Sequence, residues 1–171
     1  MSEEKIIKDR ATLARIIESL KQHGKRIVLT NGGFNLLHVG HIRSLVDARR
    51  HGDILVVAVN SDASLKKLKG DDYPVIPEDQ RLEILSALSC VDFVTLFGEA
   101  TADRILLELK PHLHAKGTDY SREGILERET VLSYGGDTVI VGDPKNHSSS
   151  RIIDTIKGWR QKNNQGGDAE P

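Results

Sequence analysis

The sequence predicts an α/β protein with an open, doubly wound sheet of five parallel strands and helices on both faces. Three observations support this prediction. Short apolar runs alternate along the chain with segments of helical periodicity, which is the pattern of strands joined by crossover helices. Five such runs occur, too few for an eight-stranded barrel. The clearest run is apolar on both faces, as a central strand of a covered parallel sheet must be.

The five expected strands share a short length, many β-branched residues and turn-forming residues at their ends. The run RIVLT, residues 26–30, is bounded by such turn residues and is therefore predicted as a buried strand. The run DILVVAVN, residues 53–60, is expected near the centre of the sheet. The full set is residues 26–30, 53–60, 92–97, 112–117 and 137–142.

The expected helices have apolar residues at helical spacing and end at recognisable stop signals. The first can be capped by Asp9 and ended by Gly24, and the next has Gly52 as its stop. The third opens on Pro77, which fits the first turn of a helix. The full set is residues 9–22, 41–52, 77–90, 101–110, 122–136 and 148–159. Strands and helices in this order predict a Rossmann-like fold, in which ligands bind beyond the carboxyl ends of the strands.

The chain is expected to form one domain over residues 1–160, because 171 residues suffice for one sizeable core. The polar tail, residues 161–171, is expected to be disordered. Residues 61–76 form the longest segment without a clear period, and we interpret them as a binding loop or lid.

Composition excludes several functional classes. Lys and Arg number 24 against 25 Asp and Glu, so the net charge of −1 offers no basic surface for nucleic acid. The single cysteine, Cys90, rules out an intramolecular disulfide and fits a reducing compartment. No apolar run approaches the roughly 20 residues needed to span a bilayer, and the charged N-terminus does not resemble a signal peptide. The expected location is the cytoplasm, with neither a membrane nor nucleic acid as a partner.

The stretch TNGGFNLLHVGH, residues 30–41, carries the strongest functional signal. Gly32 and Gly33 would allow the backbone to approach a ligand closely, and His38 and His41 follow at a predicted helix start. Such a helix end offers unpaired N–H groups to a phosphate, and two imidazoles three residues apart can face the same ligand. Ordinary structural histidines and a zinc site are the alternatives. Further zinc ligands would have to come from Cys90, His112 and His114.

The same stretch resembles the HxGH signature of the nucleotidyltransferase superfamily, the cytidylyltransferase-like enzymes, whose pattern is G-x-F-D-x-x-H-x-G-H. Members transfer a nucleotidyl group from a nucleoside triphosphate to a phosphate or phosphorylated alcohol and release pyrophosphate. The resemblance implies that His38 and His41 are catalytic and donate hydrogen bonds to the phosphates. It also implies a nucleotide-binding turn that consists of Thr30, Asn31, Gly32, Gly33, Phe34, Asn35 and Gly40.

Three further segments resemble the family's pattern near the carboxyl ends of expected strands. Residues 59–81 are similar to a segment whose lysines meet substrate and triphosphate, and residues 115–120, AKGTDY, resemble K-G-x-D-Y. Residues 147–153, HSSSRII, resemble a serine signature whose hydroxyl and N–H groups hold the distal phosphates. The implied residues are Lys116 for catalysis, Lys69, Gly117, Asp119, Ser148, Ser149 and Ser150 for the nucleotide, and Lys67 and Arg81 for the substrate. A solvated lysine loop and a plain serine cap are the alternatives from the residues alone.

Within the family, the chain is most similar to the domain that attaches AMP to D-glycero-D-manno-heptose 1-phosphate on the way to lipopolysaccharide. The likeness rests on TNGGFN, NSDASLKKLKG and AKGTDY. Some of these relatives carry the domain fused to a sugar kinase, whereas this chain resembles the stand-alone form. The resemblance implies ATP and a sugar phosphate as substrates, with Mg²⁺ held mostly by the phosphates, and it leaves a homodimer open.

Asn35 stands where the family pattern has aspartate, so it keeps an acceptor oxygen but loses a negative charge. A cytidylyltransferase for glycerol 3-phosphate or a similar alcohol phosphate is one alternative. ATP is favoured over CTP because the chain has GDPKNH, residues 142–147, where those relatives have an arginine. A flavin adenylyltransferase fits the lysine segment less well. A nucleotide-binding module without catalysis is the alternative that Asn35 itself suggests.

Overall fold

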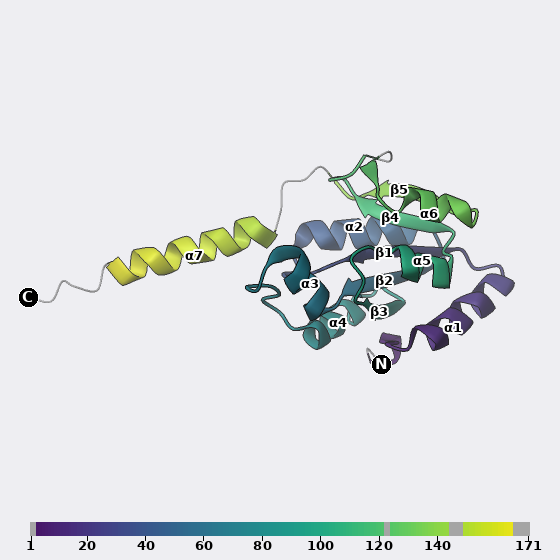
Figure 1. Cartoon of the computed structure of the whole chain (residues 1–171), viewed down its shortest axis with the longest axis horizontal. Coiled ribbons are helices and arrows are strands. Elements are labelled where there is room, and N and C mark those ends of the chain that lie inside the picture. Colours follow the sequence, from purple (N-terminus) through teal and green to yellow (C-terminus); the bar gives the residue numbers. More distant parts are fainter. Residues whose placement is uncertain (1–2, 122–123, 144–148, 166–171) are drawn as a thin grey trace, which may run out of the picture.

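The computed structural model describes residues 3–121, 124–143 and 149–165. Within these ranges, one all-parallel sheet of five strands has the order β3-β2-β1-β4-β5 (Figure 1). The strands are β1 (Ile27–Gly32), β2 (Ile54–Asn60), β3 (Phe93–Phe97), β4 (Leu113–Gly117) and β5 (Asp137–Val141). The predicted doubly wound, Rossmann-like α/β class is therefore confirmed, and all five strands lie where they were expected.

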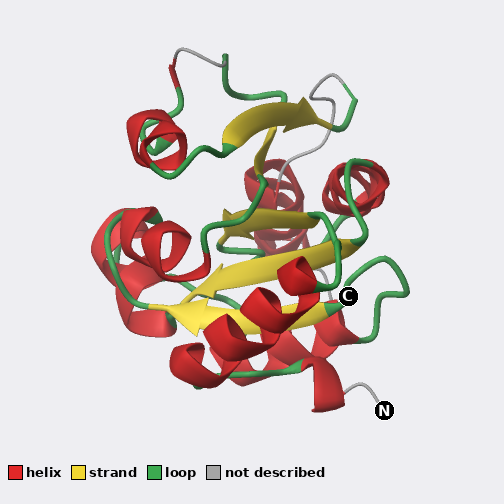
Figure 2. Ribbon diagram, turned by 90° about the vertical axis from the view of Figure 1, so that its right-hand side faces the viewer, coloured by secondary structure: helices red, strands yellow, loops and turns green. Residues whose placement is uncertain are grey.

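Helices cover both faces of the sheet (Figure 2). The helices among the described residues are η1 (Glu3–Lys5), α1 (Arg10–Gln22), α2 (Val39–Arg50), α3 (Asp62–Lys69), α4 (Glu78–Ser86), α5 (Asp103–Leu109), α6 (Arg128–Ser133) and α7 (Ser149–Gln165). Helix α7 extends away from the sheet (Figure 1). Asp9 caps α1 as predicted, because its side chain accepts a hydrogen bond from the Thr12 N–H. In the part of the chain that the structure describes, no helix combines the length and the apolar character that crossing a bilayer requires.

Two apolar cores lie on opposite sides of the sheet. The core beneath α2 and α4 contains Val57, whereas the core beneath α1, α5 and α6 contains its neighbour Val56. Successive residues of a strand point to opposite faces, so a strand covered on both sides must be apolar at every position. This explains the continuous apolar run of β2, every residue of which is buried after Ile54.

The interpretation of residues 61–76 as an irregular lid is wrong for their first half, which forms helix α3. Ser61 caps this helix, since its hydroxyl accepts from the Ser64 N–H at 3.2 Å. The buried residues of α3 are Ser64 and Leu65 alone. This buried face is too short and too polar to produce an apolar period in the sequence. The irregular part is the linker between α3 and α4, residues 70–77.

Three helix boundaries also differ from prediction. Helix α4 ends at Ser86, and α6 begins only at Arg128, since residues 126–127 before it form a turn and Ile125 is buried. Helix α7 continues to Gln165, so residues 161–165, which we expected to be disordered, belong to it. Gly158 does not stop this helix, because a single glycine lowers helix stability without breaking hydrogen bonds.

Candidate active site

The carboxyl ends of β1 and β4 lie side by side at the centre of the sheet, with Thr30 in register with Ala115. After β1 the chain continues into α2 on one face, and after β4 it continues toward α6 on the opposite face. Ligands of open parallel sheets bind at such a switch point, and the space beyond these two strand ends is called the crevice. The strand register therefore places residues 30–41 and Lys116 at the same edge of the sheet.

His38 and His41 begin α2 and cap it reciprocally. His38 Nδ1 accepts from the Gly40 N–H at 3.1 Å, and His41 Nδ1 accepts from the His38 N–H at 3.4 Å. The two rings stack with their centroids 3.9 Å apart. Because each Nδ1 accepts, each ring carries its proton on Nε2 when neutral. Two imidazole donors at a helix N-terminus suit a phosphate group.

His41 is a neutral donor. Burial lowers the pKa of His41 from 6.5 to about 4, and the nearby His38 and Lys69 disfavour the charged ring further. Lys69 lies on the last turn of α3, over the ring of Tyr73 with 5.7 Å from Nζ to the centroid. Lys67 is exposed on the same turn. The helix that sequence reasoning missed therefore carries Lys69 close enough to His41 to influence its charge.

The turn between β1 and α2 is shaped by packing within the protein. A Cβ on Gly33 would lie 2.9 Å from a methyl carbon of Leu65, and a Cβ on Gly32 would lie 3.3 Å from the Phe34 ring. Phe34 has a φ of +46°, which few residues other than glycine adopt. Its ring meets His41 at a centroid distance of 5.3 Å. The glycine pair thus makes room for the protein's own side chains, and its close approach to a ligand stays a prediction.

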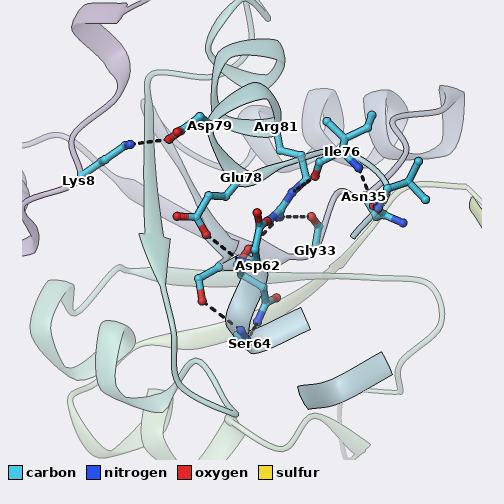
Figure 3. Close-up of polar contacts among 12 residues, drawn as sticks. Lys8, Gly33, Asn35, Asp62, Ser64, Ile76, Glu78, Asp79 and Arg81 are labelled. Carbon is cyan, nitrogen blue, oxygen red and sulfur yellow. Dashed lines mark hydrogen bonds and ion pairs between the residues drawn. The ribbon is translucent and has the colours of Figure 1, made fainter. Parts of the chain in front are cut away.

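Asn35 is buried, with 6% of its surface exposed, and it holds the linker between α3 and α4 (Figure 3). Its Oδ1 accepts from the N–H groups of Val75 at 2.6 Å and Ile76 at 3.3 Å. Its Nδ2 is buried and makes no hydrogen bond to any residue that the structure describes. Asn35 therefore acts as an acceptor in the resting structure, a task that an aspartate could also perform.

Arg81, expected to bind substrate, is placed as a structural cross-link instead (Figure 3). Its side chain has 0% exposure. Nε donates to Ile76 O at 2.9 Å, and Nη1 donates to Gly33 O at 2.6 Å and Asn60 O at 2.8 Å. Nη2 pairs with Asp62 Oδ1 at 2.6 Å. The guanidinium is thus committed to the protein itself, because Arg81 lies on the buried face of α4 together with Leu82 and Leu85, which directs it inward.

Lys116 is buried in an ion pair with Glu127. The two residues are 7% and 4% exposed, and Lys116 Nζ lies 3.2 Å from Glu127 Oε2. The ammonium also lies over the Tyr120 ring, 5.2 Å from its centroid. A buried cation requires a partner of this kind. Sequence reasoning missed Glu127. The signal that the sequence offered was indirect: a lysine at the end of a buried strand requires an acidic partner somewhere in the chain.

The amide of Asn31 and the imidazole of His114 meet across β1 and β4, with 2.8 Å between Asn31 Oδ1 and His114 Nε2. Burial lowers the pKa of His114 to about 3, an effect that Lys116 increases and Asp103 opposes. His114 is therefore neutral at neutral pH. Sequence reasoning considered His114 only as a zinc ligand and missed its contact with Asn31.

Thr30 and Gly117 border the crevice without offering it a side chain. Thr30 Oγ1 donates to Ala115 O at 2.9 Å and so joins β1 to β4. Gly117 ends β4, where a Cβ would meet no atom within 4 Å. Asp119 follows on an exposed turn. Thr30 and Gly117 are therefore expected to contribute to nucleotide binding through their backbone groups. Asp119 is expected to contribute from the exposed turn after β4.

The start of α7 lies beside the loop that precedes His38. Ser149 Oγ donates to Leu36 O at 2.9 Å. Ser150 lies in the first turn of α7, and Ser148 is outside the described residues. The contact of Ser149 thus brings one residue of the serine signature to the loop that carries the histidine signature.

Groups of three or more His, Cys, Asp or Glu side chains that could hold a metal ion do not occur among the described residues. His112 Nδ1 accepts from the Ile27 N–H at 2.9 Å, and His114 is bonded to Asn31. The zinc alternative for His38 and His41 therefore finds no further ligands in that part of the chain.

Residues 29–155 match the family model described as cytidylyltransferase-like. The bifunctional protein HldE of Pelobacter propionicus is 49% identical over 150 residues, which are 88% of this chain and 31% of that protein. The bifunctional protein HldE of Geobacter metallireducens is 47% identical over 150 residues, with the same shares of 88% and 31%. The chain thus spans about a third of the length of these relatives.

A solved structure adds a similarity in three dimensions. The lipopolysaccharide core biosynthesis protein from Thermoplasma volcanium is 27% identical to this chain, with a TM-score of 0.62. The match covers 71% of this chain and 100% of that one.

Replacing Arg81 by Met should destabilise the protein by roughly 3–5 kcal/mol, because Asp62 and three backbone carbonyls lose their donor inside the protein. Chemical denaturation of the full chain measures this change. Arg104, which is 68% exposed in its pairs with Glu99 and Glu108, is the matched control. Its replacement by Met should cost less than about 1 kcal/mol. Equal losses would contradict the structural role of Arg81.

The nucleotide-free protein should lose stability as the pH falls below about 6.5. The unfolded chain then protonates histidines with a pKa of about 6.5, whereas burial keeps His41 and His114 neutral in the folded state. The contribution of the two neutral histidines to the unfolding free energy is therefore complete above about pH 6.5. It is lost as the pH falls toward about 4, the folded-state pKa of His41. We expect unfolding free energies of His114→Gln to fall less steeply than those of the wild type, by roughly 1 kcal/mol per pH unit. Parallel curves would contradict a neutral His114.

Proposed function

The chain belongs to the cytidylyltransferase-like family, and from this premise we propose that it transfers a nucleotidyl group from a nucleoside triphosphate to a sugar phosphate and releases pyrophosphate. The observation that carries the proposal is the reciprocal cap of His38 and His41 at the start of α2. This cap lies beside the crevice between β1 and β4, where a phosphate group would meet both rings and the helix N-terminus.

In the proposed reaction, an oxygen of the acceptor's phosphate attacks the α-phosphorus of the triphosphate. The bond from this phosphorus to the pyrophosphate oxygen breaks, and pyrophosphate leaves with the electron pair. The attacking oxygen is already ionised, so no general base is required. Catalysis then consists of positioning and of stabilising charge on the phosphoryl oxygens. His38 and His41 donate to these oxygens, and the neutral state of His41 favours donation without repulsion between the rings.

Cations on two elements counter the charge of the triphosphate. Lys116 approaches from the end of β4, and Lys67 and Lys69 approach from the last turn of α3. Lys116 is already desolvated and held by Glu127, so little further desolvation is needed when a phosphate oxygen joins the pair. Ser148, Ser149 and Ser150 hold the distal phosphates. The phosphate oxygens of the nucleotide would hold Mg²⁺, which would supply further neutralisation of their charge.

We take ATP as the nucleotide and D-glycero-D-manno-heptose 1-phosphate as the acceptor, giving ADP-heptose for lipopolysaccharide. The segments TNGGFN, NSDASLKKLKG and AKGTDY support this assignment. Similarity to the HldE proteins and to a lipopolysaccharide core biosynthesis protein supports it further. CTP with glycerol 3-phosphate is the second candidate, because the matching family model is described by cytidylyl transfer.

A pyrophosphate-release assay tests the proposal with ATP and CTP, each against both anomers of the heptose 1-phosphate, glycerol 3-phosphate and flavin mononucleotide. We expect release with ATP and one heptose anomer. Release with CTP and glycerol 3-phosphate alone would replace the assignment by the second candidate. A folded protein that binds nucleotide but releases no pyrophosphate with any acceptor would be a binding module.

The His41→Ala variant should have a kcat at least about 10² lower than that of the wild type, the usual loss on removal of one preorganised donor. His51, at the opposite end of α2, provides the control. His51→Ala should keep kcat within about threefold of the wild type, since its ring lies away from the crevice. If both variants kept wild-type kcat, His41 would have no part in the mechanism.

Asn35→Asp should change kcat/KM by less than about tenfold, or 1.4 kcal/mol of transition-state free energy. The reason is that the asparagine oxygen already accepts from Val75 and Ile76, as a carboxylate would. Asn35→Leu removes the acceptor for the Val75 and Ile76 N–H groups. We expect these two amides to exchange faster in this variant, which hydrogen exchange measures. A rise of about a hundredfold in kcat/KM for Asn35→Asp would show instead that the natural chain is an impaired catalyst.

A further inference from the structure

His114 lies in the middle of β4 with 0% exposure, yet it makes a polar contact at the crevice. Its register partner on β1 is Leu29. Asn31 follows Leu29 by two residues, so Asn31 and His114 project from the same face of the sheet. The distance from His114 Nε2 to Asn31 Oδ1 is 2.8 Å. The imidazole therefore reaches the side chain at the carboxyl end of β1.

This hydrogen bond has a fixed direction. An amide oxygen only accepts, so His114 Nε2 is the donor and carries the ring proton. In the neutral ring Nδ1 is then unprotonated, and it is buried without a hydrogen-bond partner among the residues that the structure describes. The pKa of about 3 that burial imposes on His114 agrees with a neutral ring of this tautomer.

The unpaired Nδ1 makes histidine an unfavourable choice for a buried strand position. An aliphatic side chain would fill the same space without burying an unsatisfied polar atom. The feature that histidine supplies and an aliphatic residue lacks is the donor to Asn31. Filling the core therefore does not account for His114.

We propose that His114 is a positioning residue that holds the Asn31 amide so that its Nδ2–H₂ group is a fixed donor to a phosphate oxygen in the crevice. This inference rests on the proposed function, which places a nucleotide there. With its oxygen bonded to His114, the amide has only its nitrogen to offer a ligand. Lys116 follows His114 by two residues and projects from the same face, so the Lys116 ammonium and the Asn31 N–H₂ group are two donors on one side of the sheet, as an acceptor such as a phosphate oxygen requires.

Substitution of His114 separates this role from a structural one. His114→Leu keeps the volume and removes the donor, whereas His114→Gln restores an N–H donor. We expect His114→Leu to have a Tm at or above that of the wild type, because the unpaired nitrogen is gone. Its affinity for ATP with Mg²⁺ by calorimetry and its kcat/KM should each fall by about tenfold, with partial recovery in His114→Gln. Wild-type affinity and kcat/KM in His114→Leu would overturn the proposal.

A double-variant cycle tests whether His114 acts through Asn31. Asn31→Ala should lower kcat/KM, and adding His114→Leu to it should cause no further loss beyond about threefold. Multiplied losses in the double variant would overturn the proposal. Thr95→Val on β3 is the matched control, since Thr95 Oγ1 is also buried and has no described partner. It should change neither kcat/KM nor ATP affinity.

Nitrogen NMR of the wild type with labelled histidine reads the tautomer without any turnover. We expect His114 to show a protonated Nε2 and a bare Nδ1 at neutral pH, and a protonated Nδ1 would overturn the proposal. If the wild type binds ATP but transfers no nucleotidyl group, the proposed function fails. The calorimetry and the NMR then still decide on His114.

Discussion

The carboxyl edge of the sheet depends on one buried guanidinium. Arg81 has five N–H donors in a rigid fork, and its contacts join the turn after β1, the end of β2 and the linker before α4. A buried charge is tolerated only when it is paired and hydrogen-bonded. Asp62 supplies the opposite charge, and the three carbonyl oxygens accept the other hydrogen bonds. His38 and His41 follow the turn that Arg81 holds, so their position relative to β2 and α3 depends on a residue that touches neither of them.

The electrostatics of the site follow from the same constraint, the high free-energy cost of burying an unpaired charge. A site for a triphosphate without its ligand would suffer from crowded cations. Here the central groups are neutral, because burial keeps His41 and His114 uncharged and Glu127 neutralises Lys116. The exposed Lys67 and Lys69 stand on α3 in water, where their charge is screened. This arrangement fits a chain with a net charge of −1, in which attraction for an anion must be local.

Packing decides the shape of the loop that would meet the phosphates. Gly33 is pressed against Leu65, and Phe34 takes a left-handed φ of +46° while its ring meets His41. Strain of this kind persists only where the surroundings enforce it. The surroundings here are α3 and the start of α2, so the loop is shaped before any ligand arrives. Preorganisation of this kind is what electrostatic catalysis of phosphoryl transfer requires.

The sequence by itself determined the fold class, the position of every strand and the helix start that carries His38 and His41, since hydrophobic period and glycine placement are local signals. It did not reveal α3, whose buried face is too short for a period, or the inward direction of Arg81. Glu127 and His114 are paired with residues 11 and 83 positions away, Lys116 and Asn31. Such pairings depend on which strands lie side by side and which side chains burial removes from water. Only the tertiary structure could therefore decide which polar residues face a ligand and which hold the protein together.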